Sequence, residues 1–265
     1  MALLSIEKIT KSFGGLTAVS NVSMSIEEGE LVGLIGPNGA GKTTLFNLLT
    51  GVYVPTSGTI KLKVQEKDIK LNGLKPHTIS HHGVGRTFQN IRLFKELSVL
   101  ENVIVAMHQN LRYKMPSAII HLPSVFKFSK YHKEEQRLRE EAVKLLEIFE
   151  LSHKKDELAK NLSYGEQRHL EIARALATEP IFLLLDEPAA GMNQNETAAL
   201  TKTIEWIRKE FNLTVLLIEH DMSLVMKICE RIYVLDYGML IASGKPEEIK
   251  NDPKVIQAYL GEDVE

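Results

Sequence analysis

The chain has 265 residues, of which 44% are hydrophobic and 25% are charged, and its formal net charge is -2. This composition is typical of a soluble globular protein with enough apolar residues to bury its own core. The small net charge and the absence of a long basic stretch in the sequence argue against nucleic acid as a partner. The most basic segment, residues 112–133, also contains proline and aromatic residues, and we interpret it as a solvated insertion.

The sequence also limits where the chain works. Cys229 is the only cysteine, so no internal disulfide can form, and its apolar neighbours predict packing in a helix. The first residues lack the charged start and apolar length of a secretory signal, and no apolar run reaches the roughly 18 residues of a membrane helix. We therefore expect a chain that stays in a reducing compartment and does not itself cross a membrane.

The first part of the chain predicts a sheet followed by a loop and a helix. Apolar and polar residues alternate along residues 3–13 and 22–26, which indicates an antiparallel sheet with one solvated face. A buried strand is expected at residues 31–35, a helix at 44–50 and a further strand at 59–64.

The loop between that buried strand and that helix carries the strongest motif. Residues 36–43 read Gly-Pro-Asn-Gly-Ala-Gly-Lys-Thr, the pattern G-x-x-x-x-G-K-[S/T] of a phosphate-binding loop. Its glycines let successive backbone N–H groups point at phosphate oxygens, at the positive end of the following helix. Lys42 would place its charge on the β- and γ-phosphates, and the Thr43 hydroxyl would enter the Mg²⁺ shell. The sequence thus predicts a nucleoside triphosphate with Mg²⁺, held by Gly36, Pro37, Asn38, Gly39, Ala40, Gly41, Lys42, Thr43 and Thr44.

The middle of the chain has a residue pattern typical of helices. Apolar residues recur at helical spacing between Leu138 and Phe149 within a stretch rich in Glu, Lys and Arg, and a second helix is expected at about 166–178. Strand patterns return at residues 181–185, 214–218 and 231–235, in the alternation typical of a parallel α/β sheet. Residues 236–238 then predict a hairpin turn, and Pro246 and Pro253 predict the starts of two short helices.

Two carboxylates follow the strand at 181–185. Asp186 and Glu187 would lie at the carboxyl edge of the sheet, where the phosphate loop also opens. Asp186 is suited to holding Mg²⁺ and Glu187 to orienting or deprotonating the attacking water. An apolar strand followed by an acidic helix cap is the alternative, and the neighbouring phosphate loop favours catalysis.

A further segment, Leu162-Ser-Tyr-Gly-Glu-Gln167, precedes the predicted helix at 166–178. Ser163 is well placed as an N-cap, and taken alone these residues predict only a cap. The same helix start, with Gly165 allowing close backbone approach, could also bind a phosphate.

With these motifs in this order, the chain resembles the nucleotide-binding subunits of ATP-binding-cassette (ABC) transporters over essentially its whole length. The resemblance implies an α/β fold: a P-loop NTPase (RecA-like) core with an antiparallel β-subdomain, formed by residues 1–88 and 179–265, and an inserted α-helical subdomain at 89–178. All 265 residues would form one ABC ATPase domain.

The resemblance also implies roles for single residues. The family's glutamine before the helical subdomain is matched by Gln89, which would sense Mg²⁺ and water, and its switch histidine by His220, which would donate to the γ-phosphate. Its signature serine and glycine are matched by Ser163 and Gly165. Phe13 matches the aromatic that stacks on adenine, with core packing as the alternative. Taken alone, Gln89 could be a surface residue and His220 a scaffold residue.

Two positions depart from the common family pattern, and two runs of residues indicate the subfamily. Glu166 stands where glutamine is usual, which puts an acid near the expected anion site, and Asn193 stands where most members carry aspartate. The runs Glu187-Pro-Ala-Ala-Gly-Met-Asn193 and Gly85-Arg-Thr-Phe-Gln-Asn-Ile-Arg-Leu-Phe94 are similar to the ATPases of branched-chain amino acid importers.

The resemblance therefore implies an ATP-hydrolysing subunit of an ABC importer, peripheral on the cytoplasmic face of the cell membrane. Its partners would be integral membrane permease subunits, a second ATPase subunit (self or sister) in a head-to-tail dimer and, indirectly, a periplasmic or extracellular binding protein, but not nucleic acid. Ile91, Leu93 and Phe94 predict a docking site for a permease helix, with core packing as the alternative.

Two alternative functions stay open at this point. An ATPase of a urea or lipid transporter would share the same motif order. A soluble ABC ATPase acting on nucleic acid or ribosomes typically has tandem cassettes or long coiled-coil insertions, and the sequence shows neither.

Overall fold

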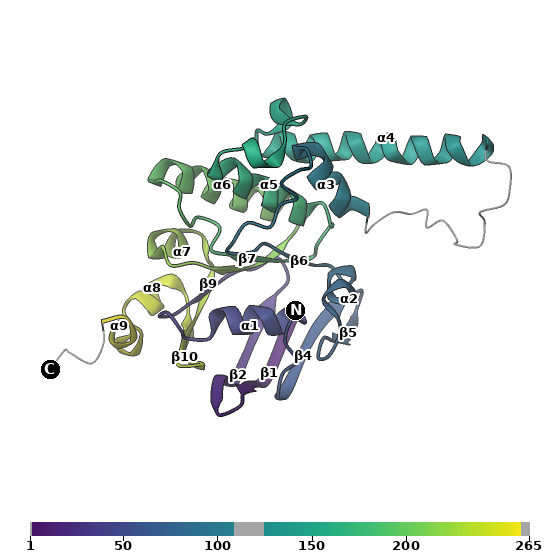
Figure 1. Ribbon diagram of the computed structural model, residues 1–265. Coiled ribbons are helices and arrows are strands. Elements are labelled where there is room, and N and C mark those ends of the chain that lie inside the picture. The colour runs from purple at the N-terminus through teal and green to yellow at the C-terminus, as the bar shows by residue number, and fades with distance from the viewer. Residues whose placement is uncertain (1, 109–124, 261–265) are drawn as a thin grey trace. The chain divides into compact units, whose positions relative to one another are not determined.

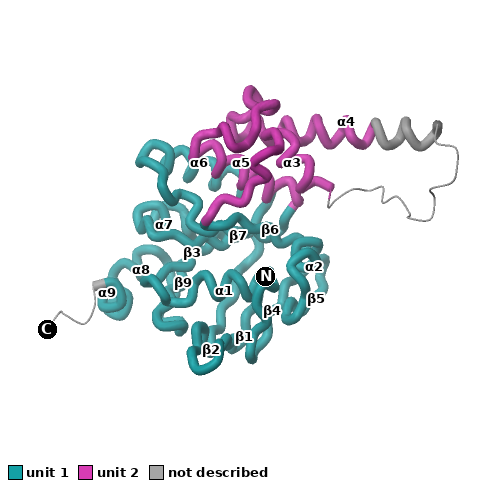
Figure 2. The backbone as a smooth tube through the Cα atoms, in the orientation of Figure 1, with its two compact units in different colours: residues 1–89, 180–265 teal, residues 90–179 magenta. Residues whose placement is uncertain are grey.

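The computed structural model describes residues 2–108 and 125–260, with only the backbone described for residues 125–132 and 260. The chain divides into two compact units, shown in different colours in Figure 2. Residues 1–89 and 180–265 form the first unit and residues 90–179 the second. These boundaries lie one residue later than those expected from the sequence, so that Gln89 belongs to the first unit.

The first unit is built on a six-stranded sheet in the order β10-β9-β3-β8-β7-β6 (Figure 1). The five strands from β9 to β6 are parallel, and β10 pairs antiparallel with β9. All residues of β3, β7 and β8 are buried, as expected for strands covered on both faces. The strands are β3 (Leu31–Ile35), β6 (Val84–Arg86), β7 (Phe182–Asp186), β8 (Thr214–Ile218), β9 (Arg231–Asp236) and β10 (Met239–Gly244).

A second, antiparallel sheet of four strands has the order β2-β1-β4-β5. It contains β1 (Ala2–Phe13), β2 (Leu16–Glu27), β4 (Ser57–Val64) and β5 (Lys67–Lys70). Buried residues alternate with more exposed ones along much of β2, which confirms the predicted solvated face. Buried apolar side chains from both sheets and from the helix after β3 form one core, which includes Leu4, Ile26, Leu34, Phe46, Leu62 and Leu216.

Helices complete the first unit. They are α1 (Lys42–Leu49), α2 (Pro76–His81), α6 (Gln194–Glu210), α7 (Met222–Ile228), α8 (Pro246–Lys250) and α9 (Pro253–Leu260). In Figure 1, α6 to α9 lie on the left of this unit. The prolines predicted to start two late helices are indeed the first residues of α8 and α9, because proline lacks an N–H that the first turn does not need.

The second unit is helical. It contains α3 (Val99–Met107), α4 (Val125–Ile148), α5 (Tyr164–Leu176) and two short 3₁₀ turns, η2 (Ser152–Lys154) and η3 (Ala159–Asn161). The spacing of Leu138, Ala142, Leu146 and Phe149 is explained by α4 and the turn after it, since all four side chains are buried. Most of the basic segment at 112–133 lies outside the described residues.

Several predicted boundaries shift when compared with the structure. The helix after the phosphate loop begins at Lys42 rather than Thr44, and the helix after Ser163 begins at Tyr164 rather than near Glu166. The strand expected at 181–185 extends to Asp186, which is itself buried. None of the described helices is long and apolar enough to cross a membrane.

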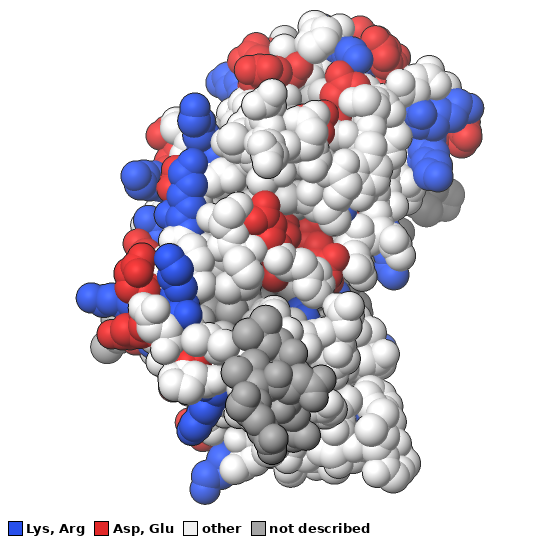
Figure 3. All heavy atoms as spheres, turned by 90° about the vertical axis from the view of Figure 1, so that its left-hand side faces the viewer, with Lys and Arg blue, Asp and Glu red and all other residues white. Residues whose placement is uncertain are grey.

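The surface carries charges of both signs. On the face drawn in Figure 3, Lys and Arg side chains follow one margin with Asp and Glu among them, and a further acidic group lies nearer the middle.

Candidate active site

The phosphate-binding motif forms the connection between β3 and α1. Gly36 and Gly41 both have left-handed backbone angles, with φ of 150° and 100°. A Cβ on Gly36 would press directly against the carbonyl oxygen of Leu235, and one on Gly41 would lie 2.5 Å from the carbonyl oxygen of Ala18. The curled backbone of this loop therefore requires glycine at both positions.

The loop is held from outside by the hairpin between β9 and β10. The Gly238 N–H donates to the Ala40 carbonyl at 3.0 Å, and the Gly238 carbonyl accepts from Ser20 N–H at 2.8 Å. The sequence predicted the turn at 236–238 but not this contact, because the hairpin lies almost 200 residues downstream of the loop.

Lys42 is nearly buried at the start of α1, with 6% of its surface exposed. Its Nζ donates to the carbonyl oxygens of Gly36 at 2.6 Å and Pro37 at 2.9 Å. Burial lowers the pKa of Lys42 below its usual value, while the carboxylates of Glu187 and Asp186 act in the opposite direction. The ammonium thus lies within reach of the loop and within the field of both predicted acids.

The remaining residues of the loop and of the α1 start differ in exposure. Asn38, Gly39 and Thr43 are exposed, whereas Ala40 is buried and Pro37 and Thr44 are half-buried.

Asp186 ends β7 and forms a buried ion pair. Its Oδ2 lies 3.1 Å from Nη2 of Arg86, and only 9% of the arginine side chain and 4% of the aspartate side chain are exposed. Nη1 of Arg86 also donates to the side-chain oxygens of Asn47 and Thr50 on the α1 side. A buried carboxylate is costly without a partner, and Arg86 supplies one. Sequence reasoning missed Arg86, although it stands three residues before Gln89.

Glu187 lies at the centre of a small hydrogen-bonded cluster. Its Oε2 accepts from Nε2 of Gln89 at 2.9 Å, and its Oε1 lies 2.8 Å from Nε2 of His220. Because an ionised carboxylate only accepts, this bond requires a hydrogen on Nε2 of His220. The structure brings together the three residues that the sequence proposed as catalytic.

Sheet order explains the cluster. Strand β8 lies between β3 and β7, so the chain segments after all three strands emerge at the same edge. The phosphate loop follows β3, Glu187 follows β7 directly, and His220 is the second residue after β8.

Ser163 and Gly165 belong to the second unit, at the start of α5. Ser163 is the N-cap: its Oγ accepts from Glu166 N–H at 3.4 Å, and the Glu166 carboxylate accepts from Ser163 N–H at 2.9 Å. Glu166 Oε1 also pairs with Lys154 Nζ at 2.7 Å. The acid expected to disturb an anion site is thus directed to the cap and to a lysine, and these contacts lower the pKa of Glu166.

The other departure from the family pattern, Asn193, also takes part in capping a helix. It is the N-cap of α6, and its Oδ1 accepts from the N–H groups of Asn195 and Glu196. An asparagine serves this purpose as well as an aspartate.

Phe13 ends β1 and is not a core residue. Its side chain is 42% exposed and meets Tyr53 edge-on, with ring centroids 5.1 Å apart. Nζ of Lys11 lies 4.8 Å from the centroid of the Phe13 ring. Core packing, the alternative at this position, is therefore wrong.

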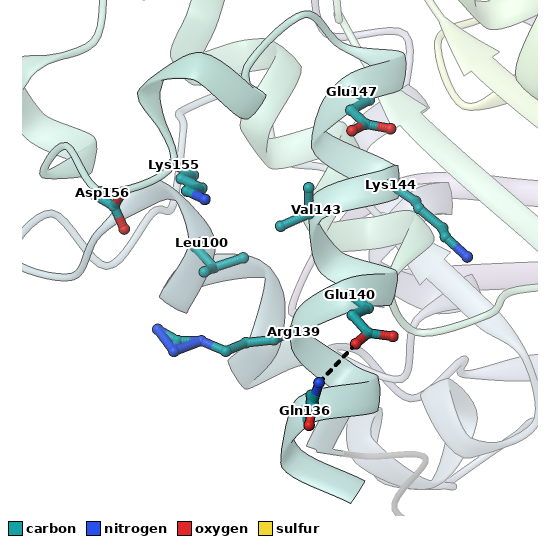
Figure 4. Close-up of a pocket in the computed structure, with 9 residues that line it drawn as sticks. All are labelled: Leu100, Gln136, Arg139, Glu140, Val143, Lys144, Glu147, Lys155 and Asp156. Carbon is teal, nitrogen blue, oxygen red and sulfur yellow. Dashed lines mark hydrogen bonds between the residues drawn. The ribbon is translucent and has the colours of Figure 1, made fainter. Parts of the chain in front are cut away.

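A separate hollow of about 700 Å³ lies in the second unit (Figure 4). Side chains of α3, α4 and the segment after η2 line it, and they carry both signs of charge. Gln136 Nε2 donates to Glu140 within it at 3.1 Å. The lining residues are Leu100, Gln136, Arg139, Glu140, Val143, Lys144, Glu147, Lys155 and Asp156, and none was singled out from the sequence.

Comparison with known proteins identifies the family of this site. The family model described as ABC transporter matches residues 19–190, a span that includes the phosphate loop, Ser163 and Glu187. The chain belongs to the ABC transporter family. It is therefore an ATPase of the ATP-binding-cassette type, and the predicted fold class and family are confirmed. A second model, described as branched-chain amino acid ATP-binding cassette transporter, matches residues 239–265.

Relatives of known name and structure agree with this assignment. The chain is 48% identical over 260 residues to the high-affinity branched-chain amino acid transport ATP-binding protein LivG of Salmonella typhimurium, covering 98% of each chain. A crystal structure of an ABC transporter cassette in its ADP conformation matches with a TM-score of 0.81 and 33% identity, over 99% of this chain and 100% of that one. A dimeric post-hydrolysis cassette bound to ADP and Pi matches with a TM-score of 0.75 and 26% identity, over 92% and 98%.

Proposed function

We propose that this chain hydrolyses ATP to energise the uptake of branched-chain amino acids through separate membrane permease subunits. The main structural support for an ATPase site is the Glu187 carboxylate. It is hydrogen-bonded to Gln89 and His220, and it lies at the same edge of the sheet as the phosphate loop. The substrate class rests on the 48% identity to LivG over 98% of both chains and on the C-terminal family match.

In this proposal the phosphate loop and Lys42 bind the β- and γ-phosphates. The glycine-shaped backbone at 36–41 accommodates phosphate oxygens, and Lys42 exchanges its two carbonyl partners for them. A phosphate there would offset the burial that now lowers the pKa of Lys42.

Glu187 would orient and deprotonate the attacking water, and His220 would turn its Nε2 hydrogen from Glu187 to the γ-phosphate once ATP is bound. The 2.8 Å bond between Glu187 and His220 is consistent with a hydrogen on Nε2, which this donation requires. Gln89, on the other carboxylate oxygen, would help to hold the water. Phosphoryl transfer needs positioned charges more than covalent chemistry, and this cluster supplies them.

The donor set also fits Mg²⁺. Protein sites for Mg²⁺ often supply one or two carboxylates and leave much of the shell to substrate phosphates and water. The Thr43 hydroxyl, the Asp186 carboxylate and Gln89 would hold the ion here, and Arg86 already pairs with Asp186. When bound, the ion neutralises charge on the phosphates.

The partners follow from the same resemblance. Ser163 and Gly165 would face the phosphate loop of a second ATPase subunit in a head-to-tail dimer, and the dimeric form of a similar cassette supports this. The membrane subunits would recruit the chain to the cytoplasmic face, and a substrate-binding protein on the other side would contact only those subunits.

The coupling of the ATPase to transport tests the function. The chain, co-purified with its permease subunits, should show ATP hydrolysis stimulated by a leucine-loaded binding protein. Stimulation by a urea-loaded binding protein instead would redirect the substrate assignment. Activation by nucleic acid or ribosomes, without permease subunits, would contradict the transport function.

Phe13 gives the first prediction, because its exposed ring is available for adenine stacking. Phe13→Ala should weaken ATP binding about ten-fold or more, since stacking is worth about 1–3 kcal/mol per base. Equilibrium titration with a fluorescent ATP analogue measures the change, and Phe13→Tyr, which keeps a π-face, is the matched control. Equal affinities for parent and Phe13→Ala would remove the stacking role.

Phe94 gives the second prediction. Its side chain is 51% exposed, whereas Ile91 and Leu93 are half-buried. An exposed apolar side chain of this kind suits a docked permease helix. Phe94→Asp should abolish stimulated hydrolysis in the assembled transporter but leave ATP binding intact, while Phe94→Leu should retain coupling. Parent-level stimulation in Phe94→Asp would place docking elsewhere.

A further inference from the structure

Glu219 is a buried acid that the proposed chemistry leaves unused. It follows β8 directly and precedes His220, and only 3% of its surface is exposed. Burial raises the pKa of its carboxyl group, and the charge of Glu187 acts in the same direction. A carboxylate in this setting destabilises a fold unless strong donors surround it.

The donors around Glu219 are backbone N–H groups on two separate segments. Its Oε1 accepts from Ala189 N–H at 2.7 Å, and its Oε2 accepts from His220 N–H at 3.2 Å. These bonds, with one from the N–H of Asp221, counteract the rise in its pKa. One carboxylate therefore connects the segment two residues after Glu187 with the residue that carries the imidazole.

The backbone at Glu187 needs such support. Its φ is 48°, in the left-handed region, which costs a non-glycine residue about 1 kcal/mol or more. The turn is held by bonds from Glu187 N–H to the Ile218 carbonyl at 2.9 Å and from Ala190 N–H to the Glu187 carbonyl at 3.2 Å. The hydrogen bond from Ala189 N–H to the Glu219 carboxylate is a third restraint on this turn, and it connects the turn to the end of β8.

We propose that Glu219 is a positioning residue, which fixes the geometry of the Glu187–His220 pair by binding the backbone beside each partner. Its side chain does not reach substrate; it acts through the two residues that would. The proposal rests on the proposed function in one respect, namely that this pair acts in ATP hydrolysis.

The first test compares Glu219→Gln with Glu219→Ala and with Glu210→Gln, an exposed acid at the end of α6. Glutamine keeps one acceptor oxygen but turns an NH₂ group toward the other N–H, so one of the two bonds is lost. Hydrolysis should fall about 10–100-fold in Glu219→Gln, because a displacement near 1 Å at a reacting group costs about 10² in rate. ATP affinity should stay within about two-fold, and Glu210→Gln should match the parent.

A double-mutant cycle separates positioning from general stability. If Glu219 acts only through the Glu187–His220 pair, adding Glu219→Gln to a variant that carries both Glu187→Gln and His220→Ala should lower turnover by no more than about two-fold further. Full additivity, or a loss of ATP affinity equal to the loss of turnover, would overturn the proposal.

Amide hydrogen exchange provides a readout that does not depend on activity. The N–H groups of Ala189 and His220 should exchange faster in Glu219→Ala than in the parent, while those of β8 should not change. Faster exchange with parent turnover would reject the positioning role. If Glu187→Gln itself turns over like the parent, the proposed function fails instead, a result that the single variant distinguishes.

Discussion

Replacing Glu187 with glutamine is expected to lower ATP hydrolysis by about 10²–10⁴, the usual contribution of a positioned general base. Glutamine has the same shape and can still accept from Gln89 or His220, but it cannot take a proton from water. Binding of ATP should persist, because the phosphate loop and Lys42 are unchanged. Steady-state hydrolysis by the assembled transporter, with ATP affinity measured separately, gives both quantities.

A suitable control for Glu187→Gln is Glu196→Gln, which alters an exposed acid in the first turn of α6. It should leave turnover close to that of the parent. A Glu187→Gln transporter that hydrolyses ATP within a factor of about two of the parent would exclude the general-base role.

Gly36→Ala is expected to weaken ATP binding strongly. The new Cβ would meet the backbone carbonyl of Leu235, which cannot rotate away, so the loop must move. Backbone shifts from overpacking typically cost about 1–3 kcal/mol, occasionally more, which corresponds to an affinity loss of about 5–150-fold if the distortion falls on the binding loop. Isothermal titration with ATP measures this loss.

Gly39→Ala is the matched comparison for Gly36→Ala. Gly39 also has a positive φ, of 81°, but a Cβ there would have no atom within 4 Å. It should therefore show only the effect of strain, about 1 kcal/mol. Equal losses of affinity in the two variants would show that strain, and not the contact with Leu235, decides the requirement for glycine at position 36.

The sequence predicted the parts of this molecule that are encoded locally. Three short segments have patterns that directly predict their structure or chemistry: the phosphate loop, the buried strand before it and the pair Asp186-Glu187. Their meeting at one edge also followed, because parallel strands present their carboxyl ends together.

Elements without a strong pattern were missed. Strand β6 has only three residues, and β5, Lys67–Lys70, has three charged residues among its four. Both are formed by their neighbours in a sheet rather than by their own propensity.

Polar contacts between residues far apart in the sequence could not be predicted either. The pairing of Arg86 with Asp186 joins residues 100 positions apart, and Glu219 reaches back 30 positions to Ala189. No rule of residue spacing predicts contacts at such sequence separations. The capping role of Glu166, by contrast, follows from its place three residues after Ser163, a spacing that the sequence already displays.

Uptake of radiolabelled leucine tests the central claim most directly, namely that ATP hydrolysis at the Glu187 site energises import of branched-chain amino acids. The chain is reconstituted into proteoliposomes with its permease subunits, binding protein and Mg-ATP on the cytoplasmic side. We expect leucine, isoleucine and valine to accumulate with the parent chain and not with Glu187→Gln. ATP hydrolysis by the parent complex without accumulation of any of the three, or equal accumulation with Glu187→Gln, would contradict the account.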